Sequence, residues 1–217
     1  MKSTNKNLNS DFQALIETAQ FLRSENGCPW DKDQDSESLE QYLLQETYEV
    51  LEAIDNNDYE NLKEELGDLM FQIILQCIIM EEEEKFSLVE VINSVNKKLI
   101  KRHPHVFGEK RSNDMDTEAV EKQWGELKKK ESKSNAEYLR NITKTLPTLS
   151  FAFALMKKTA DLEMDVDTSR EFDKKTISEL IEIQFKISSA ASKKNIDLEN
   201  EYRKYLKVKQ LDIIKRL

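Results

Sequence analysis

Four acidic residues in the N-terminal half of the chain form two matched pairs. Glu46 and Glu49 make the first pair, Glu65 and Asp68 make the second, and the members of each pair are three residues apart. On a helix this spacing places both carboxylates on one face, where like charges repel each other. Folding alone therefore does not favour the pattern, and a bound cation is one explanation for it.

The two acidic pairs are placed symmetrically about a predicted turn. The segment DNND, residues 55–58, separates a helix predicted over about residues 37–54 from one over about residues 58–83. If these helices are antiparallel neighbours, each pair lies about two turns from the connection and the pairs face each other. Four convergent carboxylates with one or two Mg²⁺ or Mn²⁺ ions would make an all-oxygen site suited to phosphoryl chemistry. The alternative is that the acids lie on solvent-exposed helix faces, as isolated pairs at this spacing commonly do.

A basic segment on the next predicted helix could bind phosphate groups. That helix begins at a capping-box pattern formed by Ser87 and Glu90 and ends near RHPHVFG. Arg can hold phosphate through paired hydrogen bonds, and Lys supplies a compact charge. The alternative is a basic last turn that the helix dipole favours. The candidate phosphate-binding residues are Asn96, Lys98, Lys101 and Arg102.

Aromatic residues offer a second kind of contact to a nucleotide. The rings of Trp30, in the segment CPWD, and Trp124 could stack on a nucleobase. The alternative is that both are packing anchors, which is a frequent role of large apolar side chains. For His103 and His105, which flank Pro104, we expect structural hydrogen bonds in an exposed loop rather than metal binding.

The composition indicates a helical protein that does not coat nucleic acid. The chain has 217 residues, of which 35% are charged, with 4 Gly, 3 Pro and a formal net charge of -9. Few breakers and many charged residues favour helix, and an acidic chain is poorly suited to binding a nucleic-acid polymer. The N-terminus lacks the apolar stretch of a signal peptide, and the longest apolar run, residues 73–80, is too short to span a membrane. We therefore expect a cytoplasmic protein.

Apolar periodicity and capping residues predict an all-α fold. The segment LMFQIILQCIIM is apolar on nearly all sides, so we expect it in a core or at the interface of a homodimer, with Cys77 as a buried thiol. The segment KKKESKSNAE reads as a linker, and CPWDKDQDSES as an ordered loop. Besides the helices already named, we predict one from Ser10 or Asp11 to about Asn26, one from Asp116 or Thr117 to about Lys130, and others over about residues 147–162, 172–193 and 198–217.

Four segments together resemble a known family. GCPWDKDQ, YLLQETYEVLEAI, EELGDLMFQ and KLIKRHPHVFG resemble the N-terminal repeat of MazG nucleoside triphosphate pyrophosphohydrolases, across about residues 12–107. WGELKKKE and LRNITKTLPTL also resemble family segments. The resemblance implies a helical bundle of the MazG type and a Mg²⁺-dependent, usually dimeric enzyme. Such an enzyme cleaves a nucleoside triphosphate between the α and β phosphates to give a monophosphate and pyrophosphate.

The resemblance also implies roles for individual residues. Glu46, Glu49, Glu65 and Asp68 would be the catalytic metal ligands. The basic segment at residues 96–102 would face the substrate. Gln45 stands where the family signature has Glu, and we expect it to support a ligand rather than to bind the metal.

The C-terminal part resembles a degenerate and truncated second repeat. SELIEI retains one acidic pair, Glu179 and Glu182, but no second pair follows it. One pair cannot complete a four-carboxylate site, so we predict a catalytic domain at residues 1–132 and a degenerate helical region at residues 133–217. The rival hypothesis is a catalytically weak helical binding or dimerisation module derived from such an enzyme.

Overall fold

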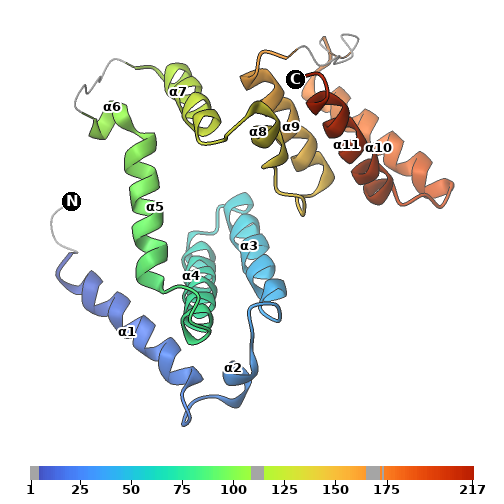
Figure 1. Cartoon of the computed structure of the whole chain (residues 1–217). Coiled ribbons are helices and arrows are strands. Elements are labelled where there is room, and N and C mark those ends of the chain that lie inside the picture. Colours follow the sequence, from blue (N-terminus) through green and yellow to red (C-terminus); the bar gives the residue numbers. More distant parts are fainter. Residues whose placement is uncertain (1–4, 109–114, 165–171, 173) are drawn as a thin grey trace. The chain divides into compact units, whose positions relative to one another are not determined.

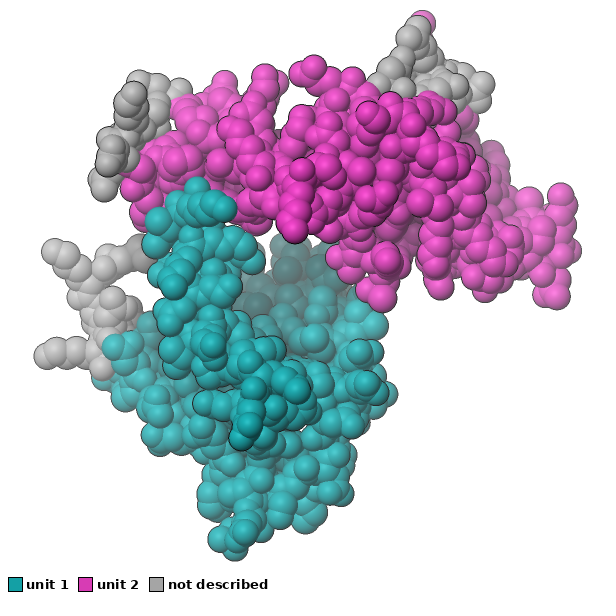
Figure 2. Space-filling view, in the orientation of Figure 1, with its two compact units in different colours: residues 1–101 teal, residues 102–217 magenta. Residues whose placement is uncertain are grey.

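The prediction of an all-α protein is confirmed. The computed structural model describes residues 5–108, 115–164, 172 and 174–217, and within them it contains eleven α-helices and no strand (Figure 1). The chain divides into two compact units, residues 1–101 and residues 102–217, which Figure 2 colours separately. No helix among the described residues combines the length and the apolar character needed to cross a membrane.

In unit 1, α3 and α4 form a helical hairpin. A three-residue connection joins these two helices, and Asn57 in it has a positive φ of 54°. Asp58 caps α4, with its carboxylate accepting a hydrogen bond from the backbone N–H of Asn61 at 3.1 Å, which agrees with the predicted helix start near residue 58. The helices of this unit are α1 (Asn5–Arg23), α2 (Pro29–Asp33), α3 (Glu40–Asp55), α4 (Tyr59–Glu82) and α5 (Leu88–Arg102), whose last residue falls in unit 2.

The second half of α4 is buried on two sides. Ile74 and Ile78 pack against Ala19 of α1, whereas Leu75 belongs to a separate cluster with Leu39. Cys77 is buried, as predicted. Burying each large aliphatic side chain contributes about 1.5–3 kcal/mol. This packing fixes α4 between α1 and the start of α3, and thereby fixes the acidic first half of α4 against α3.

Unit 2 has its own core, formed mainly between α8, α9 and α11. Leu139, Phe151, Leu155 and Leu206 are buried in one cluster. The helices of this unit are α6 (Pro104–Phe107), α7 (Thr117–Lys130), α8 (Asn135–Arg140), α9 (Thr148–Asp161), α10 (Ile177–Lys193) and α11 (Leu198–Ile214).

Several boundaries differ from the sequence-based expectation. α1 begins at Asn5 and passes through Ser10, whose hydroxyl donates to the carbonyl of Asn7 at 2.7 Å instead of capping the helix. The predicted linker, residues 128–137, includes the end of α7 and the start of α8, because Ser134 accepts a hydrogen bond from the N–H of Glu137 and starts a helix there. α10 begins at Ile177, later than expected, because a capping box formed by Thr176 and residue 179 sets its start. The predicted loop at residues 28–38 contains the short helix α2.

Candidate metal centre and its surroundings

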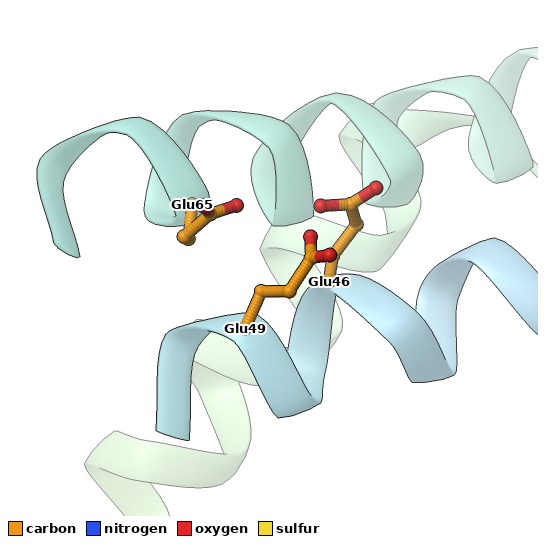
Figure 3. A group of neighbouring side chains, drawn as sticks. All are labelled: Glu46, Glu49 and Glu65. Atoms are coloured by element: carbon orange, nitrogen blue, oxygen red, sulfur yellow. The ribbon is translucent and has the colours of Figure 1, made fainter. Parts of the chain in front are cut away.

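Three of the four predicted acidic ligands converge between α3 and α4. Glu46 and Glu49 project from α3 toward Glu65 on α4 (Figure 3). One carboxylate oxygen from each of the three residues can be chosen so that all three oxygens lie within 4.8 Å of one another. All three side chains are partly buried. The hairpin thus gathers three carboxylates from two helices at one point, as the spacing about the turn predicts.

Asp68 lies at the edge of this acidic cluster. It follows Glu65 by three residues on α4 and is exposed, and it is not one of the three residues whose oxygens meet within 4.8 Å. Its charge is nevertheless close enough to contribute to raising the pKa of both Glu46 and Glu65. Asp68 is therefore an electrostatic neighbour of the cluster.

The acidic cluster is electrostatically unbalanced. Partial burial raises the pKa of Glu46, and repulsion from Glu49 raises it further. Desolvation likewise raises the pKa of Glu65, followed by repulsion from Glu49 and Asp68. Among the described residues, no Lys or Arg forms an ion pair with Glu46, Glu49 or Glu65. A divalent cation would supply the missing positive charge, and a set of carboxylate oxygens suits Mg²⁺ or Mn²⁺.

Gln45 supports the cluster through Glu49. Its side-chain amide donates a hydrogen bond to Glu49 Oε1 at 3.1 Å. A Glu at position 45 would add a further negative charge there, whereas the amide contributes a donor. This contact is consistent with the expectation that Gln45 positions a ligand.

The residues predicted to bind the phosphate groups, one amide and three cations, lie on the last two turns of α5. Asn96, Lys98 and Lys101 are exposed, and Lys98 also lines a shallow cavity of about 380 Å³. Arg102 forms an ion pair with Glu131, which follows α7. The structure therefore places three of these side chains at the surface and commits the guanidinium of the fourth to a carboxylate.

Trp30 packs edge-on against α3. Its ring centroid is 5.5 Å from that of Tyr42, with an interplanar angle of 82°. About half of the residue is exposed. Trp30 is thus a packing anchor that still presents part of its indole to solvent.

The C-terminal acidic pair has a different environment. Glu179 accepts a hydrogen bond from the backbone N–H of Thr176 at 2.7 Å and lies 3.7 Å from the ammonium of Lys175. Glu182 pairs with Lys186 at 3.3 Å. Glu179 therefore helps to cap α10, and both acids form ion pairs that stabilise this helix.

A cavity that the sequence analysis missed lies in unit 2. It has a volume of about 480 Å³, and its lining includes Trp124, Lys128, Tyr138, Lys158 and Asp161. Burial lowers the pKa of Lys128 and of Lys158, and neighbouring cations lower both further. The segment WGELKKKE contains Trp124 and Lys128, which line this cavity. The other lining residues come from two further helices, and no local sequence pattern predicts how the three helices pack.

Comparisons with known proteins agree with the resemblance. Residues 34–107 match the model of the MazG nucleotide pyrophosphohydrolase domain. The nucleoside triphosphate pyrophosphohydrolase of Escherichia coli K12 is 35% identical over 179 residues, which cover 81% of this chain and 67% of that protein. The nucleoside triphosphate pyrophosphohydrolase/pyrophosphatase MazG of Thermotoga maritima is 37% identical over 155 residues, covering 71% of this chain and 58% of that protein.

Other relatives match over different shares of their length. The uncharacterized protein YabN of Bacillus subtilis is 42% identical over 149 residues, which cover 68% of this chain but 29% of that protein. The chain thus spans from under a third to about two thirds of the length of the curated relatives described here. The crystal structure of a mazG-related protein from Thermotoga maritima shows 34% identity and a TM-score of 0.46, covering 54% of this chain and 98% of that one.

Proposed function

Because this chain belongs to the MazG nucleotide pyrophosphohydrolase family, we propose that it hydrolyses nucleoside triphosphates between the α and β phosphates. The products are a nucleoside monophosphate and pyrophosphate. The observation that carries the proposal is the convergence of Glu46, Glu49 and Glu65 within 4.8 Å, without a basic partner among the described residues.

In this proposal the acidic cluster holds Mg²⁺, or Mn²⁺ in its place. Glu46, Glu49 and Glu65 are the ligands, and Asp68 joins them from the edge of the cluster. When bound, such an ion would supply positive charge to offset the charge that develops on the phosphate oxygens. One carboxylate of the cluster orients the attacking water and accepts its proton, as a general base must lie within hydrogen-bond reach of that water.

The remaining predicted residues bind the substrate. Asn96, Lys98 and Lys101 are exposed and can contact the phosphate chain, and Arg102 would exchange Glu131 for phosphate. The exposed part of Trp30 can contact the nucleobase. These roles carry the family resemblance over to side chains that are at least partly exposed.

We further propose that catalysis belongs to residues 1–132 and that residues 133–217 form a degenerate, truncated repeat. The lysine partners of Glu179 and Glu182 support this division, because acids that are already paired have less need of a metal ion.

We also propose that the protein is a homodimer. Two helices of unit 1 expose apolar side chains at helical spacing, so each forms a stripe along one face. Exposed apolar patches of this kind mark association surfaces. The residues, each between 44% and 56% exposed, are Leu44, Tyr48 and Leu51 on α3 and Leu66, Met70 and Ile73 on α4.

Release of pyrophosphate from a panel of nucleoside triphosphates, with and without Mg²⁺, tests the proposed reaction. We expect Glu65→Gln and Asp68→Asn each to lower Mg²⁺-dependent turnover by about a hundredfold or more, because metal affinity and phosphate placement fall together. Circular dichroism should show that both variants remain helical.

The matched control is the double variant Glu179→Gln/Glu182→Gln, which removes an acidic pair with the same spacing. Its turnover should stay within a few-fold of that of the wild type. Loss of activity in this control would mean that the active site lies in residues 133–217, which would contradict the proposed division. No turnover by the wild-type protein on any triphosphate would favour the binding-module hypothesis.

A further inference from the structure

A second cavity in unit 2 combines an apolar floor with a cationic rim. It lies between α9 and α11 and has a volume of about 290 Å³, close to the lower end of the range for small-molecule sites. Phe151 and Leu206 form the floor and are almost fully buried. Lys144, Arg203 and Lys207 contribute the charges, and none of the described residues that line the cavity is acidic.

The N-terminal end of α9, beside this cavity, already binds one carboxylate of the protein, that of Glu199. The carboxylate of Glu199 accepts hydrogen bonds from the backbone N–H of Thr148 at 3.0 Å and from its hydroxyl at 2.7 Å. Arg203 lies 3.6 Å from the same carboxylate. The hydrogen bond from the Thr148 hydroxyl is the main cause of a lowered pKa at Glu199. Thr148 and Arg203 together therefore stabilise the charged form of this carboxylate.

Glu199 does not balance all of the positive charge. Neither Lys144 nor Lys207 forms an ion pair or a side-chain hydrogen bond within the described part of the chain. One carboxylate thus stands against three cations. A ligand with about two negative charges would balance the site, whereas a simple carboxylate would leave it positive.

We propose that this cavity binds a small, soluble organic phosphate monoester. Lys144, Lys207 and Arg203 hold the phosphoryl group, since guanidinium and ammonium donors form charge-assisted hydrogen bonds to phosphate oxygens. The organic part lies on Phe151 and Leu206 and gains from leaving water. All of these residues belong to unit 2, and none is part of the acidic cluster on α3 and α4.

Isothermal titration calorimetry of the full chain with phenyl phosphate tests this assignment. EDTA in the buffer keeps the acidic cluster free of metal, so the readout does not depend on hydrolysis. We expect saturable binding of phenyl phosphate, with inorganic phosphate and benzyl alcohol each weaker by about tenfold or more, because each lacks one half of the ligand. Lys207→Gln should weaken phenyl phosphate binding by about tenfold.

Lys204→Gln is the matched control. Lys204 lies on the same helix, pairs with Glu201 at 2.6 Å and does not line the cavity. This variant and Glu65→Gln should bind phenyl phosphate like the wild type. Equal losses in Lys204→Gln and Lys207→Gln, or loss of binding in Glu65→Gln, would overturn the site.

Three further outcomes would overturn the ligand class. The first is the absence of saturable binding of phenyl phosphate. The second is equal affinity for phenyl phosphate and inorganic phosphate, which would mean that the apolar floor takes no part. The third is sedimentation with phosphatidic-acid vesicles without binding of phenyl phosphate, which would indicate a membrane surface instead of a soluble ester.

Discussion

Replacing Glu46 by Gln tests the acidic cluster without relying on turnover. The facing oxygens of Glu46 and Glu49 lie within 4.8 Å, where two unit charges repel by about 0.9 kcal/mol even in bulk water. Partial burial strengthens this repulsion and solvent screening weakens it. We therefore expect Glu46→Gln to raise the free energy of unfolding of the metal-free protein by about 1 kcal/mol. For a chain of 217 residues this corresponds to a rise in Tm of about 2–4 °C.

Mg²⁺ should reverse the order of stability. A ligand that binds only the folded state at about a hundred times its Kd stabilises that state by about 2.7 kcal/mol. The wild-type protein should gain such stability, whereas the variant has lost a metal ligand and should gain far less. Thermal unfolding followed by circular dichroism, in EDTA and in saturating Mg²⁺, measures both effects.

Glu52→Gln is the control for the change in charge. Glu52 lies on the same helix, is exposed and is outside the acidic cluster. This variant should keep the full response to Mg²⁺. The reasoning fails if Glu46→Gln is less stable than the wild type in EDTA and yet shows the same Mg²⁺-induced rise in Tm.

Two further predictions concern pH and assembly. The stability that Glu46→Gln gains without metal should disappear below about pH 4, where the wild-type carboxyl is protonated in both the folded and the unfolded state. It should grow as pH rises through the raised pKa of Glu46, because above that pKa the wild-type side chain is charged in both states and its charge is less favourable in the folded one. Urea unfolding of both proteins across this range tests it. Light scattering at micromolar concentration should show a dimer, and Tyr48→Glu or Met70→Glu should give a monomer, whereas Ile177→Glu, an exposed apolar position in unit 2, should not. A monomeric wild type would contradict the proposed interface.

The start of a helix could be predicted from the sequence where a capping residue stands directly before it. The Ser87–Glu90 pair starts α5 as predicted. Asp116, one of the two predicted candidates, caps α7, and Asp58, near which a helix start was predicted, caps α4. Each satisfies a backbone N–H that the helix leaves unpaired. Ser10 offers the same chemistry, but its hydroxyl is used inside α1. The short helix α8 escaped prediction because six residues are too few to show an apolar period.

Helical geometry predicts which acidic residues of the candidate site converge, but not how exposed each one is or which partners it has. The spacing of Glu46, Glu49 and Glu65 about a short turn predicted their convergence, and the hairpin brings them together. Residues three apart on a helix still differ in direction by about 60°, so Glu65 can point at α3 while Asp68 stays at the edge. The degree of exposure of Asp68 and the pairing of Arg102 with Glu131 depend on tertiary packing, which spacing does not determine.

The C-terminal pair, Glu179 and Glu182, and the N-terminal pair, Glu46 and Glu49, have the same spacing but differ in whether nearby lysines offset their charge. Glu179 and Glu182 each have a lysine four residues away in sequence, at 3.7 Å and 3.3 Å, so their charges are offset by Lys175 just before α10 and by Lys186 within it. Glu46 and Glu49 have no such partner among the described residues and face a third carboxylate across the hairpin. Partial burial makes that repulsion costly to leave uncompensated. The carboxylates of the N-terminal hairpin are thus left without an offsetting positive charge, as a proposed cation site would be, whereas those of the C-terminal pair are offset by their lysine partners.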